Sequence, residues 1–296
     1  MFEPLPLRTR KGALQLGRPS IIGVLNTTPD SFSDGGKFLD PGRAEAWALA
    51  LEAAGAQVID VGGESTRPGA AAVSAQQEID RVVPVIRRLA GRLRVPLSID
   101  TRKAAVAEAA LEAGADVVND VSGLADPDLG RVAARYHVPV ILGHLRGEPS
   151  TMQEHPCFKD VVAEVIEELA ATVDRAVACG IERDQVIVDP GLGFGKTTEQ
   201  TVALLAATRE IRARIGRPVC VGPSRKSFLG ALTGAGVERR LIGTAAATAI
   251  AVFLGADFVR LHDVGDLRDA VVVAAALRAA RHRAQFAGVQ RPESVP

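Results

Sequence analysis

Four acidic or amide side chains stand where short apolar runs of the sequence end and turns begin. They are Asp60, Asp100, Asn119 and Asp189. Any one of them, taken singly, is most simply explained as a cap for a following helix. Several carboxylates that face one cavity need partners, however, because an unpaired buried charge is costly. Together they predict a site for a ligand that is rich in N–H donors.

Cationic side chains follow other apolar runs in the same way. They are Arg67, Lys226, Arg260 and His262. Alone, each would be solvated or paired with one of the carboxylates. With Asn26 and the hydroxyl groups of Ser65 and Thr66, they predict an anion site that suits a diphosphate with magnesium. We assign no catalytic role to His144 or to the Met152-Gln153 pair.

The elements that must position these side chains are eight short apolar runs, each turning polar at its carboxyl end. Ala-rich segments with helical periodicity lie between the runs, so the chain predicts eight strand–helix units. Such units close into a single (β/α)8 TIM barrel, an α/β fold whose reactive mouth is formed by the carboxyl ends of its strands. The predicted strands cover 20–26, 58–60, 97–100, 117–120, 140–144, 186–189, 218–221 and 258–262.

The chain is expected to form one domain with two short additions. Residues 1–19 predict an extended or hairpin extension that caps the barrel, with a turn near Lys11-Gly12. The barrel would cover 20–286, and a polar tail over 287–296 is expected to be mobile. Ser74 and Gln77 form a predicted capping box. Helices are expected near 43–54, 74–92, 103–113, 127–136, 160–178, 198–214, 239–253 and 267–284.

The composition is that of a globular protein without a strong overall charge. The 296 residues are 47% hydrophobic, and 35 Lys and Arg residues balance 35 Asp and Glu residues. This balance argues against nucleic acid or a membrane as partner and favours small molecules. Neither a signal peptide nor an anchor is predicted, and the cysteines have no metal-binding spacing. We therefore expect a cytoplasmic protein.

The residues around the strand ends also resemble a known family. Long motifs occur in order over about residues 20–265, and together they resemble the signatures of the dihydropteroate synthases, which are pterin-binding TIM barrels. After the fifth predicted strand the family commonly shows Met-His-Met, whereas this chain has Gly143, His144 and Leu145. The matching motifs are LNTTPDSFSDGG (25–36), IDVGGESTRPG (59–69), SIDT (98–101), NDVSG (119–123), DPGLGFGKT (189–197), GPSRKS (222–227) and RLHDV (260–264).

The resemblance implies a transferase of folate biosynthesis (EC 2.5.1.15). Its reaction would condense (7,8-dihydropterin-6-yl)methyl diphosphate with p-aminobenzoate and release 7,8-dihydropteroate and diphosphate. The resemblance also implies Mg²⁺ as cofactor and a homodimer formed through the last helices.

The roles implied for individual residues fall into three groups. The pterin would be held by Asp100, Asn119, Asp189, Lys226 and Arg260. The diphosphate would be held by Asn26, Thr66, Arg67, Arg260 and His262, with Asn26 also touching the metal. The p-aminobenzoate would be bordered by Pro68, Phe194, Ser224 and Lys226. The residues implied to be catalytic are Lys226, Arg260, Asp100 and Asp189.

The difficult chemical step is breaking the carbon–oxygen bond to diphosphate, because p-aminobenzoate is already a usable nucleophile. We therefore expect an ionisation-first substitution in which cationic groups stabilise the leaving group and the electron-rich pterin stabilises a carbocation. Such a cation must be kept from water, so the loops over 27–39 and 63–73 are expected to close over the mouth.

Two other functions stay open at this point. A methyltetrahydrofolate-dependent methyltransferase would share the carboxylate pocket but would need a corrinoid partner. A catalytically silent paralogue would only bind pterin or take part in an assembly. The intact Ser224-Arg225-Lys226 segment favours the synthase over the methyltransferase. The retention of Asn26 and His262 favours activity over silence.

Overall fold

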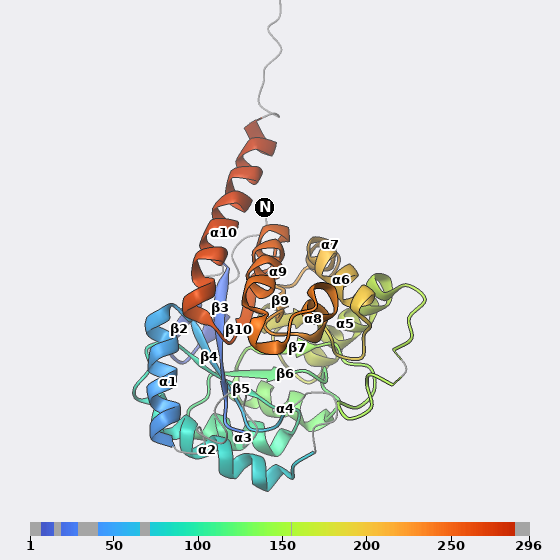
Figure 1. Cartoon of the computed structure of the whole chain (residues 1–296). Helices are drawn as coiled ribbons and strands as arrows, with labels where there is room; N and C mark the ends of the chain where they lie inside the picture. The colour runs from blue at the N-terminus through green and yellow to red at the C-terminus, as the bar shows by residue number, and fades with distance from the viewer. Residues whose placement is uncertain (1–6, 15–18, 29–40, 66–71, 155, 288–296) are drawn as a thin grey trace, which may run out of the picture.

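The computed structural model describes residues 7–14, 19–28, 41–65, 72–154 and 156–287. Their centre is a sheet of eight parallel strands in the order β8-β7-β6-β5-β4-β3-β10-β9 (Figure 1). The sheet closes on itself, because Val188 of β8 forms a bridge with Val219 beside β9. The predicted barrel is thus confirmed. Its strands are β3 (Ser20–Asn26), β4 (Val58–Gly62), β5 (Leu97–Asp100), β6 (Val117–Asp120), β7 (Val140–Gly143), β8 (Val186–Asp189), β9 (Cys220–Val221) and β10 (Phe258–Leu261).

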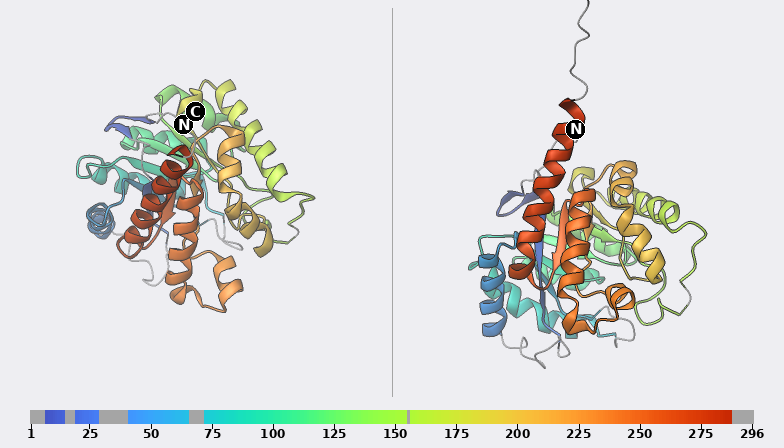
Figure 2. Two further views of the ribbon diagram at one scale, coloured as in Figure 1. Left: turned by 90° about the horizontal axis from the view of Figure 1, so that it is seen from above. Right: turned by 45° about the horizontal axis from the view of Figure 1, so that its top comes forward.

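Helices surround the strands on the outside of the barrel (Figure 2). The last and longest helix runs past the other elements, so that its C-terminal end projects from the body (Figure 1). Along the described residues, none of the helices combines the length and the apolar character needed to cross a membrane. The helices are α1 (Pro41–Ala54), α2 (Ala75–Ala90), α3 (Ala104–Ala113), α4 (Pro127–Tyr136), α5 (Val161–Ala178), α6 (Thr198–Ala206), α7 (Thr208–Ile215), α8 (Ser227–Thr233), α9 (Leu241–Leu254) and α10 (Val264–Ala287).

Tight turns join the helices to the strands that follow them. Gly114 ends α3 with a φ of 120°, a left-handed conformation that glycine adopts without strain. A Cβ atom at this position would lie 2.5 Å from the Cβ of Ala90, so only glycine lets α2 and α3 approach this closely. At the other end of α2, Ser74 and Gln77 form the predicted capping box. Short turns thus close the face of the barrel away from the mouth, and the capping box fixes the start of α2 on the mouth side.

Three elements differ from the sequence prediction. The predicted helix over 198–214 is broken at Ala207, where the hydroxyl group of Thr208 donates to the carbonyl of Leu205 at 2.6 Å and competes with the helical pattern. Strand β9 is only two residues long, because Pro218 has no N–H to donate and the N–H of Val219 donates to Asp257 Oδ2 at 3.0 Å instead of to a neighbouring strand. Helix α8 was not predicted, and it begins directly after Lys226.

The N-terminal hairpin consists of β1 (Leu7–Thr9) and β2 (Gly12–Leu14) and covers the end of the barrel away from the mouth. Leu7 is fully buried among the first residues of the barrel strands, including Ile22, Val58 and Phe258. The side chain of Lys11 donates to the carbonyls of Leu93 and Val95. The predicted tail over 287–296 lies, apart from Ala287, outside the described residues.

Candidate active site

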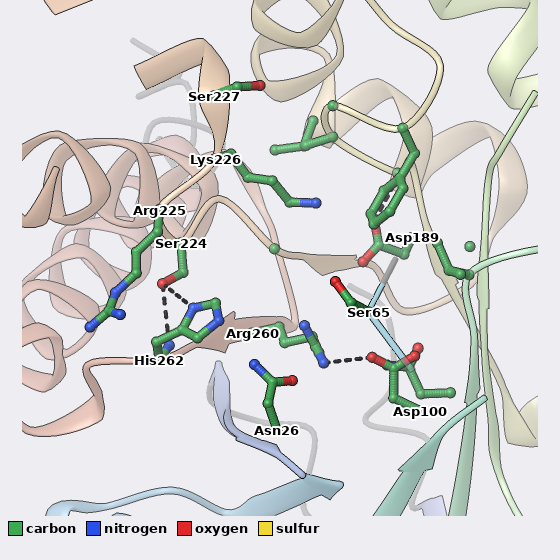
Figure 3. A pocket seen from close by; sticks show the side chains of 18 of the residues that line it. Asn26, Ser65, Asp100, Asp189, Ser224, Arg225, Lys226, Ser227, Arg260 and His262 are labelled. Carbon is green, nitrogen blue, oxygen red and sulfur yellow. Dashed lines mark hydrogen bonds and ion pairs between the residues drawn. The ribbon is translucent and has the colours of Figure 1, made fainter. Parts of the chain in front are cut away.

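A cavity of about 440 Å³ opens at the carboxyl ends of the strands (Figure 3). Apart from Asp60, every predicted site residue within the described ranges lines it. These residues are Asn26, Ser65, Asp100, Asn119, Asp189, Phe194, Ser224, Lys226, Arg260 and His262. Three further predicted residues, Thr66, Arg67 and Pro68, lie outside the described residues, as do most of the two loops that were expected to close over the mouth. The strand ends therefore bring residues far apart in the sequence into one space.

The acidic side of the cavity comes from neighbouring strands. Asp100 is the last residue of β5, and the register of the sheet sets it opposite Asn119 of β6. Asp189 is the last residue of β8, and its Oδ1 accepts a hydrogen bond of 2.8 Å from the backbone N–H of Gly191. Oxygen and amide groups from β5, β6 and β8 thus face a common space.

Arg260 of β10 is held in that space by two carboxylates. Its Nε donates to Asp60 Oδ2 at 2.6 Å, and its Nη2 donates to Asp100 Oδ2 at 2.7 Å. Asp60 is fully buried and also accepts from the side-chain amide of Asn119 at 2.9 Å. The expectation that Asp60 faces the mouth is wrong, because it lies behind the wall and orients Arg260 and Asn119 instead.

Burial and neighbouring charges shift the pKa values of the ionisable side chains that line the cavity. Burial raises the pKa of Asp100 to about 7, although the charge of Arg260 opposes the shift. Burial likewise raises the pKa of Asp189 above its ordinary value. Burial alone would lower the pKa of Arg260, but Asp60 and Asp100 outweigh it and raise that pKa. Arg260 therefore stays charged at every accessible pH.

Lys226 points into the cavity from the turn before α8 (Figure 3). Its Nζ lies 3.7 Å from the centroid of the Phe194 ring, a cation–π contact. Burial lowers the pKa of Lys226 to about 8, and the nearby charge of Asp189 limits the shift. The ammonium group is thus poorly solvated and available to a ligand.

The turn that presents Lys226 is fastened on both sides. Arg225 has a φ of 59°, a left-handed conformation that is strained for a side-chain-bearing residue. Its Nε donates to Asp263 Oδ2 at 3.0 Å, and its carbonyl accepts from Arg240 Nη1 at 3.0 Å. On the opposite side, Ser224 Oγ lies 2.9 Å from His262 Nδ1. These contacts hold a strained backbone that directs Lys226 inward.

Several lining residues were missed by sequence reasoning. Met152, to which we assigned no role, is buried in the wall, and Arg240 and Ser227 also line the cavity. Ser227 could have been found from its place next to Lys226. Met152 and Arg240 give no such signal, because a loop and a turn bring them to the mouth.

The residues present fit a magnesium ion that is bound mainly by substrate. Among the residues with described positions, no group of three or more His, Cys, Asp and Glu side chains could hold a metal. Mg²⁺ commonly keeps water and binds one or two protein oxygens together with phosphate oxygens. Asn26 offers one amide oxygen in the space shared with Arg260 and His262 (Figure 3).

Comparisons with known proteins agree with this geometry. Residues 22–262 match the family described as "Pterin binding enzyme". The chain is 45% identical to a dihydropteroate synthase of Synechocystis sp. over 93% of this chain and 96% of that protein. A Yersinia pestis dihydropteroate synthase, solved in a sulfonamide drug complex, has a TM-score of 0.89 and 42% identity, covering 93% of this chain and 99% of that one.

A Xanthomonas albilineans dihydropteroate synthase, solved with 4-aminobenzoic acid, has a TM-score of 0.84 and 43% identity and covers 90% of this chain and 96% of its own. Identity at this level over nearly the full length of each relative exceeds what a shared barrel fold alone would produce. The chain therefore belongs to the pterin-binding enzyme family and, within it, to the dihydropteroate synthases.

Proposed function

We propose that the cavity condenses (7,8-dihydropterin-6-yl)methyl diphosphate with p-aminobenzoate, giving 7,8-dihydropteroate and diphosphate. The observation that carries the proposal is that Asp189 and Lys226 lie on one rim of one cavity (Figure 3). Groups that can grip a nitrogen heterocycle are therefore within reach of groups that can receive its departing phosphates.

The pterin would lie between the acidic wall and Arg260. A pterin presents an amino group beside a ring N–H, and a carboxylate accepts such a paired edge bidentately. Asp189 can still supply an acceptor, because Gly191 donates to its Oδ1 and the other donor, the Cys220 thiol, is weak. Asn119 and Asp100 add donors and acceptors along neighbouring strands. The planar guanidinium of Arg260 suits a flat ring better than an ammonium group would.

The diphosphate would lie at Asn26, Arg260 and His262, where positive charge gathers at the mouth. A bound Mg²⁺ would supply charge stabilisation for the departing diphosphate. Arg260 and Lys226 would stabilise the same developing charge as the carbon–oxygen bond breaks, and removing one such contact commonly costs about 2.7–4 kcal/mol. The electron-rich pterin would stabilise the carbocation, so bond breaking precedes attack by the amine.

The p-aminobenzoate would lie against Phe194, Ser224 and Lys226. The ring of Phe194 offers an apolar surface to the aromatic nucleophile, and Lys226 lies over that ring. An apolar ring beside a cation suits a molecule that is aromatic at its centre and anionic at one end. The amino group would then face the carbon that loses diphosphate.

A direct assay separates this function from its alternatives. Purified protein is mixed with Mg²⁺, the pterin diphosphate and p-aminobenzoate, and dihydropteroate is measured. Product formation supports the synthase. Tight pterin binding without product would support the silent paralogue. Methyl transfer from methyltetrahydrofolate to a corrinoid protein would support the methyltransferase.

The pH profile of the reaction should report on two buried groups. We expect kcat/KM for the pterin diphosphate to rise as Asp100 loses its proton near pH 7 and to fall as Lys226 loses its proton near pH 8. Below the first pKa the carboxyl group cannot accept paired donors, and above the second the amine carries no charge. Steady-state rates across this range would measure both limbs.

A Lys226→Arg variant provides the control for that profile. Its guanidinium keeps its charge throughout the range, so the alkaline limb should disappear while the acidic limb stays. An alkaline limb that is unchanged in this variant would contradict the assignment to Lys226.

We also propose that the enzyme is a homodimer formed through α9 and α10. These helices pack against each other and expose large apolar side chains. The most exposed are Ile242 at 83%, Val273 at 58%, Val272 and Leu277 at 56% each and Ile250 at 51%. A surface patch of this kind favours burial against a second copy.

Sedimentation velocity tests the homodimer proposal. The wild-type protein is expected to sediment with twice the mass of one chain at micromolar concentration, and a variant with Ile242→Glu and Ile250→Glu as a monomer. A wild-type monomer would contradict the proposal.

We place the enzyme in the cytoplasm, where Cys157, Cys179 and Cys220, all free thiols, would stay reduced.

A further inference from the structure

A hydrogen-bonded series of polar side chains, buried at Lys196 and His144 and half-exposed at Glu168, lies behind the wall that carries Phe194. It ends at Lys196, which is only 3% exposed. The Nζ of Lys196 lies 2.8 Å from the carbonyl oxygen of Phe194 and 3.2 Å from that of His144. It also lies 3.0 Å from His144 Nδ1. These three acceptors match the three hydrogens of the ammonium form of Lys196, which burial disfavours by lowering the pKa of Lys196 to about 7.

The state of His144 follows from its two neighbours. Because Lys196 donates to Nδ1, that nitrogen must accept, and the ring proton belongs on Nε2. The Nε2 atom lies 2.9 Å from Glu168 Oε2, which can accept that proton in a hydrogen bond. Burial and the charge of Lys196 lower the pKa of His144 to about 4, which keeps the imidazole neutral. The series of hydrogen bonds therefore runs from Glu168 through His144 to Lys196.

The loop from Asp189 to Thr197 is held partly by its own hydrogen bonds, from the Phe194 N–H to the Gly191 carbonyl at 3.1 Å and from the Gly191 N–H to Asp189 Oδ1 at 2.8 Å. Gly191, Gly193 and Gly195 have φ values of 65°, 75° and 63°. A Cβ atom on Gly191 would come within 2.0 Å of the carbonyl oxygen of His144. The loop must therefore be glycine-rich to lie against the backbone after β7, and glycine leaves it with much conformational freedom. Contacts with residues outside the loop, from His144 to Lys196 and from the Gln153 side chain to the Gly193 carbonyl, help to hold it in one conformation.

The same loop joins the two halves of the cavity. It begins at Asp189, on the acidic wall, and its only aromatic residue is Phe194, whose ring lies under Lys226. Lys196 binds the carbonyl group of Phe194 itself. The position of the Phe194 ring thus depends on a contact made on the far side of the wall.

We propose that Lys196 is a positioning residue for the second substrate, p-aminobenzoate. Held by His144 and Glu168, its ammonium group fastens the Phe194 backbone and so keeps the aromatic wall at the correct distance from Lys226. The inference rests on the proposed function, because it places p-aminobenzoate beside Phe194. The simpler alternative is that Lys196 only stabilises the fold. That alternative predicts that loss of Lys196 changes the KM values of the two substrates equally.

The test compares the KM values of the two substrates in the full-length enzyme with Mg²⁺. Lys196→Met keeps the length of the side chain but removes all three hydrogen bonds. We expect it to raise the KM for p-aminobenzoate about tenfold, the factor that corresponds to about 1.4 kcal/mol, and to leave the KM for the pterin diphosphate within about twofold. Lys159→Met is the matched control, because Lys159 is exposed just before α5.

Two variants of His144 provide a second test that does not depend on the folding of Lys196→Met. The amide oxygen of asparagine can stand near the place of Nδ1 and accept from Lys196, whereas the amide of glutamine reaches the place of Nε2. We expect His144→Gln to raise the KM for p-aminobenzoate and His144→Asn to keep it within about twofold.

Failure of the inference can be distinguished from failure of the proposed function. Equal changes in both KM values, or an unchanged KM for p-aminobenzoate in Lys196→Met and His144→Gln, would overturn the inference and leave the function standing. Wild-type protein that makes no dihydropteroate would overturn the proposed function and the inference with it.

Discussion

An Asp189→Asn variant is expected to lose about a thousandfold in kcat/KM for the pterin diphosphate. The reason lies in the hydrogen bond from Gly191, which Asp189 Oδ1 accepts at 2.8 Å. An asparagine would keep its amide oxygen on that N–H and so turn its NH₂ group toward the ligand. The NH₂ donors of the asparagine would then face the N–H donors of the pterin. Because both sets of buried donors would stay without acceptors, the variant should bind the pterin much more weakly.

Steady-state kinetics and calorimetric titration of the pterin diphosphate would measure the loss. The effect should appear in both kcat/KM and the dissociation constant, because the carboxylate is proposed to hold the pterin before any bond breaks. Asp160→Asn is the matched control, since Asp160 caps α5 by accepting from Val162 and Ala163, and asparagine caps equally well. Pterin affinity within threefold of wild type in Asp189→Asn would show that the pterin does not bind at Asp189.

The sequence predicted the mouth of the barrel well because strand ends are local features. An apolar run followed by a polar residue can be recognised without any knowledge of its neighbours, as with Asp100 and Asp189. Parallel strands in one closed sheet then place such residues together wherever they occur in the chain. The cavity accordingly collects Asn26 from β3 and His262, which directly follows β10, as expected.

How deep a side chain lies within the barrel could not be predicted in the same way, because it depends on the register between neighbouring strands. Gly62 of β4 pairs with Asp100, so Asp60 pairs with Ser98 and lies two residues deeper. The sequence shows only that Asp60 comes near the end of an apolar run. The contact of Lys196 with His144 was missed for a related reason, since it joins loops that follow different strands, β8 and β7.

Because Asp60 lies deep in the barrel, its ion pair with Arg260 is buried, and loss of Arg260 is expected to lower both stability and activity strongly. Arg260→Met would leave Asp60 and Asp100 without their shared cation, and Asp60 Oδ1 already has no hydrogen-bond partner among the described residues. Breaking a buried pair by removing one partner commonly destabilises a protein by about 3–5 kcal/mol. The same change removes a cation from the proposed diphosphate site, which should lower kcat by about 10²–10³.

A double-mutant cycle separates these two consequences of losing Arg260. Asp60→Asn keeps the shape of the side chain but removes its charge, so the double variant with Arg260→Met should be more stable than the sum of the single changes predicts. The coupling measured by urea unfolding should be about 2 kcal/mol or more. Activity should behave differently: the double variant should stay as slow as Arg260→Met, because neutralising Asp60 cannot restore a cation to the cavity. Recovery of activity in the double variant would mean that Arg260 acts only by neutralising Asp60, and strictly additive stabilities would mean that the two side chains are not coupled in solution.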